Sequence, residues 1–101
     1  METMPTLYEY MGIEISFWSN EHYPIHIHAE YNGAEMKVSF FLEEGNIYRT
    51  TFKAGKGNFP PAKLKNLKKF VAVYKTEIIN AWTEHFVWQK HITPKKITKR
   101  L

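Results

Sequence analysis

Alternating apolar and polar residues along the first half of the chain predict β-strands. The first such run spans residues 13–18, and the same period of two recurs over residues 25–31 and 35–41; a fourth strand is expected over residues 47–52. Side chains two positions apart lie on the same face of a strand, so each run has one apolar face and one polar face. An Asn32-Gly33 pair joins the second and third runs and is a strong hairpin signal. These features predict an antiparallel β-meander of three to four strands.

The second half of the chain changes to a helical period. From Ala62 to Trp88, apolar residues recur every three or four positions, which predicts one long helix with a single apolar stripe. Asn58 and two prolines precede it, as is common where helices begin, and the pattern is compatible with a break near Asn80. We therefore expect an α+β fold with the long C-terminal helix packed on one face of the meander. The other face is expected to be open or covered by a second copy of the chain.

The length of 101 residues leaves room for one domain. We expect a single α+β domain over residues 1–90 and a basic, flexible tail over residues 91–101. The chain has no cysteine, which excludes disulfides and thiolate zinc sites. No apolar run approaches the roughly 18 residues that a membrane span needs. A protein of the cytoplasm without a membrane segment is expected.

Charge is divided unevenly along the chain. Residues 1–52 carry two positive residues against eight glutamates, whereas residues 53–101 carry twelve positive residues against two glutamates. The lysines of the predicted helix and of the tail can contact nucleic acid. They can equally face the acidic first half of the fold. The lysine-rich run over residues 63–69 is also typical of the solvated side of an amphipathic helix, so these interpretations stay open.

The stretch SNEHYPIHIHAE, residues 19–30, holds the densest group of side chains that can move protons or bind metals. In the predicted strand, His26, His28 and Glu30 share the polar face. Glu21 and His22 lie on the loop that enters this strand. Polar residues of these types also occupy the solvated face of a sheet without forming a site, so the pattern alone does not establish one.

Two kinds of chemistry fit this group. Two imidazoles on one strand can chelate a divalent metal such as zinc, with His22, Glu21 or Glu30 as the third ligand. Without a metal, the same imidazoles can act as general base and general acid, with Lys37 or Arg49 stabilising negative charge. The second arrangement is typical of phosphodiester cleavage. The candidate catalytic residues are His26, His28 and Glu21, and the first two are also the candidate metal ligands.

A binding surface is the third interpretation. Trp18 and Phe41 add aromatic side chains to the predicted polar face, and aromatics on such a face are typical of interface anchors. The candidate binding residues are Asn20, His22, Trp18, Glu30 and Lys37. The partner on this interpretation is a second small protein, and the uncovered face also favours a homodimer.

The first half of the chain also carries the residues of a known signature. Eight residues fit the pattern of a serine, asparagine and glutamate followed by prolines and a His-x-His pair: Phe17, Ser19, Asn20, Glu21, Pro24, His26, His28 and Tyr31. On these residues the chain resembles a family of small bacterial proteins known as a domain of unknown function. Ile25 departs from the signature, which usually has a second proline at this position.

The resemblance implies a small stand-alone protein of the cytoplasm that often belongs to a two-gene, toxin–antitoxin-like pair. It also implies that Asn20, Glu21, His26 and His28 form one functional unit. The sequence therefore predicts a partner-binding component of a toxin–antitoxin-like or regulatory module. The alternative prediction is a histidine-dependent hydrolase or nuclease, with or without a metal, that uses His26 and His28. Whether the protein is an enzyme stays open at this point.

Overall fold

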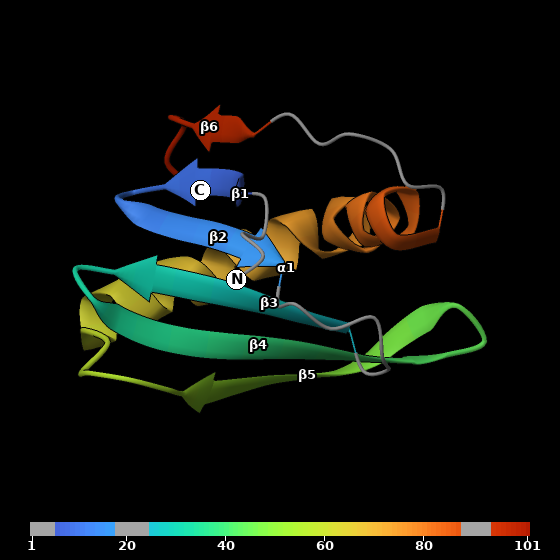
Figure 1. Cartoon of the computed structure of the whole chain (residues 1–101), viewed down its shortest axis with the longest axis horizontal. Coiled ribbons are helices and arrows are strands. Elements are labelled where there is room, and N and C mark those ends of the chain that lie inside the picture. Colours follow the sequence, from blue (N-terminus) through green and yellow to red (C-terminus); the bar gives the residue numbers. More distant parts are fainter. Residues whose placement is uncertain (1–5, 18–24, 88–93) are drawn as a thin grey trace.

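Two layers make up the protein, a mixed β-sheet and one long helix that crosses a single face of it (Figure 1). The computed structural model describes residues 6–17, 25–87 and 94–101. Within these residues the sheet has six strands in the order β5-β4-β3-β2-β1-β6. The strands are β1 (Thr6–Tyr10), β2 (Ile13–Phe17), β3 (Ile25–Tyr31), β4 (Ala34–Glu43), β5 (Asn46–Ala54) and β6 (Lys95–Ile97). The helices are α1 (Pro61–Trp82) and the π-helical turn η1 (Thr83–Val87).

The sheet corrects the predicted strand number and direction. Strands β1 to β5 pair antiparallel in sequence order, whereas β6 pairs parallel with β1. The α+β class is confirmed, but the purely antiparallel meander of three to four strands is wrong. The alternation signal misses β1 because Leu7 and Tyr8 are both buried where a bulge shifts the register. It misses β6 because Lys95–Ile97 is too short to show a period, and these three residues lie in the stretch expected to be a tail.

Tight turns join the strands that pair as hairpins. Asn32 and Gly33 have φ angles of 47° and 82°, and the turns at residues 11–12 and 44–45 show the same pair of positive values. Two consecutive positive φ angles form the turn that matches the twist of a β-hairpin. Glycine takes the second position because it has no Cβ to clash there. The hairpin predicted from Asn32-Gly33 is confirmed, and it fixes the register between β3 and β4.

Helix α1 begins one residue before the predicted start at Ala62 and ends at Trp82, six residues short of the predicted end. Its N-cap is Pro60, which makes no side-chain capping hydrogen bond, and the Pro60 carbonyl accepts the Leu64 N–H at 2.9 Å. The helix was expected to continue to Trp88, but α1 ends at Trp82 and the π-helical turn η1 begins at Thr83. The Thr83 hydroxyl donates to the Ile79 carbonyl at 3.0 Å, a local bond of the kind that bends helices. The break thus lies three residues beyond Asn80.

The core fills the space between the sheet and α1. One face of the strands and one stripe of the helix are fully buried, including Ile13, Ile15, Ile27, Val38, Phe40, Leu67, Phe70 and Ile78. Phe70 has no exposed surface, and its ring centroid lies 5.1 Å from that of Tyr8, 5.4 Å from Tyr10 and 4.7 Å from Tyr74. These contacts join α1 to the first hairpin. The opposite face of the sheet is not covered by α1, and we call it the open face.

One buried hydroxyl connects three elements at the edge of the core. The Tyr8 hydroxyl on β1 donates to the Glu77 carboxylate on α1. Burial and this contact raise the pKa of Tyr8 far above its ordinary value of 10.0. The Lys95 ammonium on β6 lies 3.4 Å from the same Glu77 oxygen. None of the helices in the described ranges is both long and apolar enough to cross a membrane.

Candidate functional site

The histidine strand lies in the middle of the sheet with the orientation that the sequence predicts. Ile27 and Ala29 have no exposed surface and face α1. His26 and His28 are half-buried on the open face, and Glu30 follows them as an exposed residue. The four predicted site residues Trp18, Asn20, Glu21 and His22 lie outside the described residues. The described site therefore rests on β3 and its neighbours.

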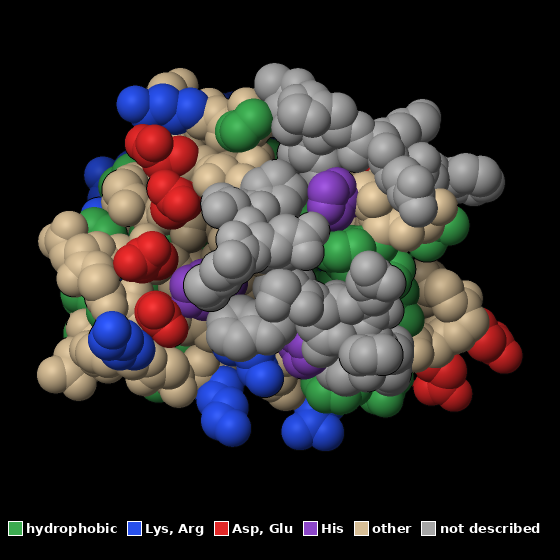
Figure 2. All heavy atoms as spheres, viewed as in Figure 1, with side chains coloured by type: hydrophobic (Ala, Val, Ile, Leu, Met, Phe, Trp, Pro, Cys, Tyr) green, Lys and Arg blue, Asp and Glu red, His purple; other side chains and the backbone are tan. Residues whose placement is uncertain are grey.

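A row of carboxylates crosses the open face next to the histidines. The register places Glu9 opposite Glu14, Glu14 opposite Glu30, and Glu30 opposite Glu35, so four neighbouring strands each contribute one. We call these four residues the carboxylate row, and Figure 2 shows acidic side chains in a line on this face. At the β6 end, the Lys96 ammonium lies 3.6 Å from Glu9. Like charges placed directly opposite on a sheet are destabilising, so this row has an energetic cost.

A second row of side chains crosses the same face one step further along the strands. Ser16 on β2, His28 on β3, Lys37 on β4 and Lys53 on β5 pair in register. Lys37 and Lys53 therefore lie directly opposite one another and form a like-charge pair of basic residues, besides the acidic pairs of the carboxylate row. A pocket of about 170 Å³ opens here, lined by His28, Glu35, Lys37, Lys53, Ala54 and Gly55. The pocket thus brings an imidazole, a carboxylate and two ammonium groups together.

His28 and Glu35 face one another on one side of this pocket. The His28 Nε2 atom lies 3.5 Å from a Glu35 oxygen, and both side chains are less than a third exposed. The backbone holds Glu35 in place, because its N–H donates to the Lys56 carbonyl at 2.7 Å and its carbonyl accepts the Gly55 N–H at 2.9 Å. A Cβ at Gly55 would lie 3.3 Å from the Glu35 Cβ, which leaves this wall of the pocket little room for a larger residue.

His26 lies beyond the pocket and has its own partner. Its Nδ1 atom and the buried Ser39 hydroxyl are joined by a hydrogen bond of 2.7 Å. Burial, and then the positive charge of Lys37, lower the pKa of His26 from its ordinary value of 6.5. The imidazole is therefore neutral at pH 7. In the neutral tautomer with its proton on Nε2, the Nδ1 atom accepts a hydrogen bond from the Ser39 hydroxyl; in the other tautomer, Nδ1–H donates to the Ser39 oxygen.

The lowered pKa of His26 predicts a loss of stability in mild acid. The unfolded chain takes up this proton near pH 6.5, whereas the folded protein takes it up only at a lower pH. The free energy of unfolding should hold above about pH 7.5 and fall as the pH drops through the interval between the two pKa values. Denaturant unfolding at about pH 7.5 and 5.5 measures this loss, and His26→Asn should show a smaller one than the wild type. Equal losses in the two proteins would contradict the assignment.

The arrangement does not form a metal site among the described residues. In residues 6–17, 25–87 and 94–101, no group of three or more His, Cys, Asp or Glu side chains is placed to hold a metal ion. His26 and His28 both lie on the open face, but the first contacts Ser39 and the second Glu35. A zinc site would need a third ligand. Of the predicted donors, Glu30 is described and forms no such group with the two histidines, whereas Glu21 and His22 lie outside the described residues. The two-histidine metal site stays a prediction.

Sequence reasoning did not assign three of the residues that complete this site. Ser39, Glu35 and Lys53 contact or face the histidines, yet none was a candidate site residue. The signal for the first two was present, because the Asn32-Gly33 turn fixes which residues of β3 and β4 lie opposite. Lys53 could not be found in this way, because a bulge near Phe41 shifts the register of β5.

With its open face charged and its other face covered by one helix, the chain is a small two-layer α+β protein. It belongs to the family described as a domain of unknown function, DUF4160, whose model matches residues 12–83. The match covers β2 to β5 and α1, so the strand with both histidines lies inside it. The expected resemblance to a family of unknown function is confirmed at that level. No curated protein and no solved structure matches the chain.

Proposed function

We propose that the protein binds a second protein through the open face of its sheet, as one component of a toxin–antitoxin-like or regulatory module in the cytoplasm. The observation that carries this proposal is the placement of like charges directly opposite one another. Three such pairs occur along the carboxylate row, and a fourth joins Lys37 and Lys53. Each pair opposes folding of the isolated chain. A partner of complementary charge would offset this repulsion on binding, so the arrangement would favour the bound state.

The size of the pocket favours a protein partner over a free small molecule. Pockets for drug-sized ligands usually hold about 300 to 1,000 Å³, whereas the pocket at His28 holds about 170 Å³. That space suits one side chain inserted from a partner surface. The partner would place basic side chains over the carboxylate row and an acidic side chain between Lys37 and Lys53. Complementary charges of this kind raise the association rate and select the correct partner.

Replacing Glu30 with glutamine tests this proposal, because folding and binding should respond in opposite directions. Glu30 faces a carboxylate on each side, so Glu30→Gln should raise the free energy of unfolding by about 0.2 to 1 kcal/mol. The same change should weaken binding to the proposed partner protein about fivefold. Chemical denaturation measures the first effect and calorimetric titration the second.

Glu43→Gln is the matched control for this experiment. Glu43 is an exposed glutamate at the end of β4, outside the carboxylate row, and its substitution changes the net charge by the same amount. It should leave both the stability and the affinity close to the wild-type values. The proposal fails if the control weakens binding as much as Glu30→Gln, or if neither variant affects it.

A histidine-dependent hydrolase or nuclease is the second candidate function. The observation that favours it is the neutral His26 imidazole beside Lys37, with His28 two residues further on the same face. A neutral imidazole can accept a proton and a lysine can stabilise a developing negative charge. The double variant His26→Ala/His28→Ala should then abolish cleavage of RNA or phosphodiester substrates and leave the fold intact. Equal turnover in the variant and the wild type, or none in either, would exclude this candidate.

A further inference from the structure

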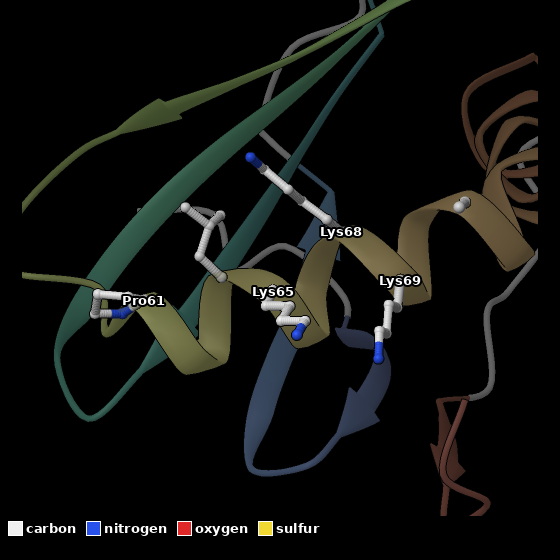
Figure 3. A pocket seen from close by; sticks show the side chains of 6 residues that line it. Pro61, Lys65, Lys68 and Lys69 are labelled. Atoms are coloured by element: carbon white, nitrogen blue, oxygen red, sulfur yellow. The ribbon is translucent and has the colours of Figure 1, made fainter.

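The outer side of α1 carries a shallow hollow on the opposite side of the molecule from the histidines. Figure 3 shows Lys68 extending toward the strands, whereas Lys65 and Lys69 extend in the other direction. The hollow holds about 470 Å³ and is lined by Pro61, Leu64, Lys65, Lys68, Lys69 and Ala72. We call it the lysine hollow. Its residues recur every three or four positions, so they form one continuous stripe along the first half of α1.

The charge of the lysine hollow is uniformly positive and unfavourable for the isolated helix. Lys65, Lys68 and Lys69 are all exposed. Lys65 lies three residues before Lys68 and four before Lys69, so its charge is repelled by both. The first turn of α1 holds no acidic residue, although the helix dipole favours one there. The only glutamate of α1 is Glu77, which contacts Tyr8 and Lys95. Carboxylates from outside this helix would offset both effects.

The floor of the lysine hollow is apolar, and this favours a protein helix over nucleic acid as the partner. Pro61 and Leu64 lie at one end of the hollow and Ala72 at the other, and the aliphatic stems of the lysines add carbon surface between them. The Lys68 ammonium reaches away over the ring of Phe52, at 5.5 Å from its centroid. A nucleic-acid backbone supplies negative charge and nothing apolar to cover this floor. An amphipathic acidic helix supplies both, because its apolar residues recur at the same spacing as the floor.

We propose that the lysine hollow is a docking surface for an acidic amphipathic helix of a partner protein. The stripe from Pro61 to Ala72 is roughly 17 Å long at 1.5 Å per residue, or about three turns of a helix. Leucine-like residues of the docked helix cover Leu64 and Ala72, and flanking glutamates lie beside the lysines. This surface is separated from the open face by the whole sheet, so the inference stands independently of the function proposed above.

Three fluorescent probes of equal length test this inference. The first is a peptide of about 16 residues, long enough to form a helix, with leucines along one side and glutamates beside them. The second carries serine in place of each leucine and keeps every glutamate. The third is a single-stranded RNA of the same length. Binding to the full chain is measured by anisotropy at about 50 and 200 mM salt, where contacts made by charge alone weaken strongly.

Two charge-reversal variants complete the design. Lys65→Glu/Lys69→Glu changes the hollow, and Lys56→Glu/Lys99→Glu changes two exposed lysines elsewhere by the same net charge. All four positions are exposed, and unchanged circular dichroism melting shows that both variants fold. We expect the leucine peptide to bind at least about tenfold more tightly than the serine peptide and the RNA. The first variant should lose about tenfold in affinity and the second less than about threefold.

Each alternative result overturns the inference. If RNA binds most tightly, the lysines form a nucleic-acid surface. If the serine peptide equals the leucine peptide, or if the two variants lose the same affinity, only net charge acts. If a second copy of the chain occupies the hollow, the wild type forms a concentration-dependent dimer that Lys65→Glu/Lys69→Glu abolishes. Absence of binding by the leucine peptide at about 50 mM salt also contradicts the inference.

Discussion

Replacing Phe70 with alanine should lower the free energy of unfolding by about 3 to 5 kcal/mol, the range for a large buried aromatic. Phe70 has no exposed surface and contacts the rings of Tyr8, Tyr10 and Tyr74. Its removal leaves a cavity between α1 and the first hairpin and deletes three aromatic contacts at once. Domains of this kind have a total stability of only about 5 to 15 kcal/mol, so the variant should be close to unfolding.

Urea denaturation followed by circular dichroism measures this effect. Phe70→Leu is the matched control, because it keeps an apolar side chain in the cavity and should lose clearly less stability than the alanine variant. Val73→Ala, at an exposed position of the same helix, should have a small effect. A loss below about 1 kcal/mol for Phe70→Ala would contradict the described core.

Ending the chain before Pro94 should lower the free energy of unfolding by about 2 to 4 kcal/mol, because the removed segment is part of the sheet. The deletion removes β6 from its pairing with β1 and takes away Ile97 and Leu101, which pack against the core. The Leu101 N–H also donates to the Tyr10 hydroxyl at 3.1 Å. Without β6 the backbone of β1 becomes an edge, which favours aggregation.

The truncation is compared with Lys99→Ala/Arg100→Ala, which keeps β6 and changes only exposed side chains. This control should unfold at nearly the wild-type denaturant concentration, whereas the truncated chain should unfold at a clearly lower one. If the truncated chain is as stable as the wild type, residues 94–101 are a tail that adds nothing to the fold, as the sequence alone suggested.

The central part of the fold follows from local sequence patterns, and the edges do not. Period-two alternation identified β2, β3 and β4, where buried apolar residues alternate with polar ones along most of each strand, and a fourth strand was expected within β5. The Asn32-Gly33 turn also fixes the register, so that His26 faces Ser39 and His28 faces Lys37. Strand β6 is different, because its three residues form a strand only through pairing with the distant β1. Such long-range pairing leaves no periodic signal in the sequence.

The site could be predicted from the sequence only where the strand register could be predicted. The shared face of His26 and His28 follows from strand geometry and is confirmed. The carboxylate row needs the pairing of β1 with β2 and of β2 with β3, which the histidine stretch alone does not give. The Lys37–Lys53 pair depends on one extra residue in the β4–β5 pairing: without the bulge near Phe41, Lys37 would lie opposite Phe52. A single inserted residue therefore decides which charge completes the pocket.

The most direct measurement of the proposed function is a nuclear magnetic resonance titration. The isotope-labelled chain is titrated with the proposed partner protein, and the backbone amide shifts are mapped onto the sheet. The account predicts the largest shifts around His28, Glu30 and Lys37 on the open face, and much smaller ones in the Glu30→Gln variant at the same partner concentration. Shifts that leave the open face unchanged, or unaltered binding by Glu30→Gln, would contradict it.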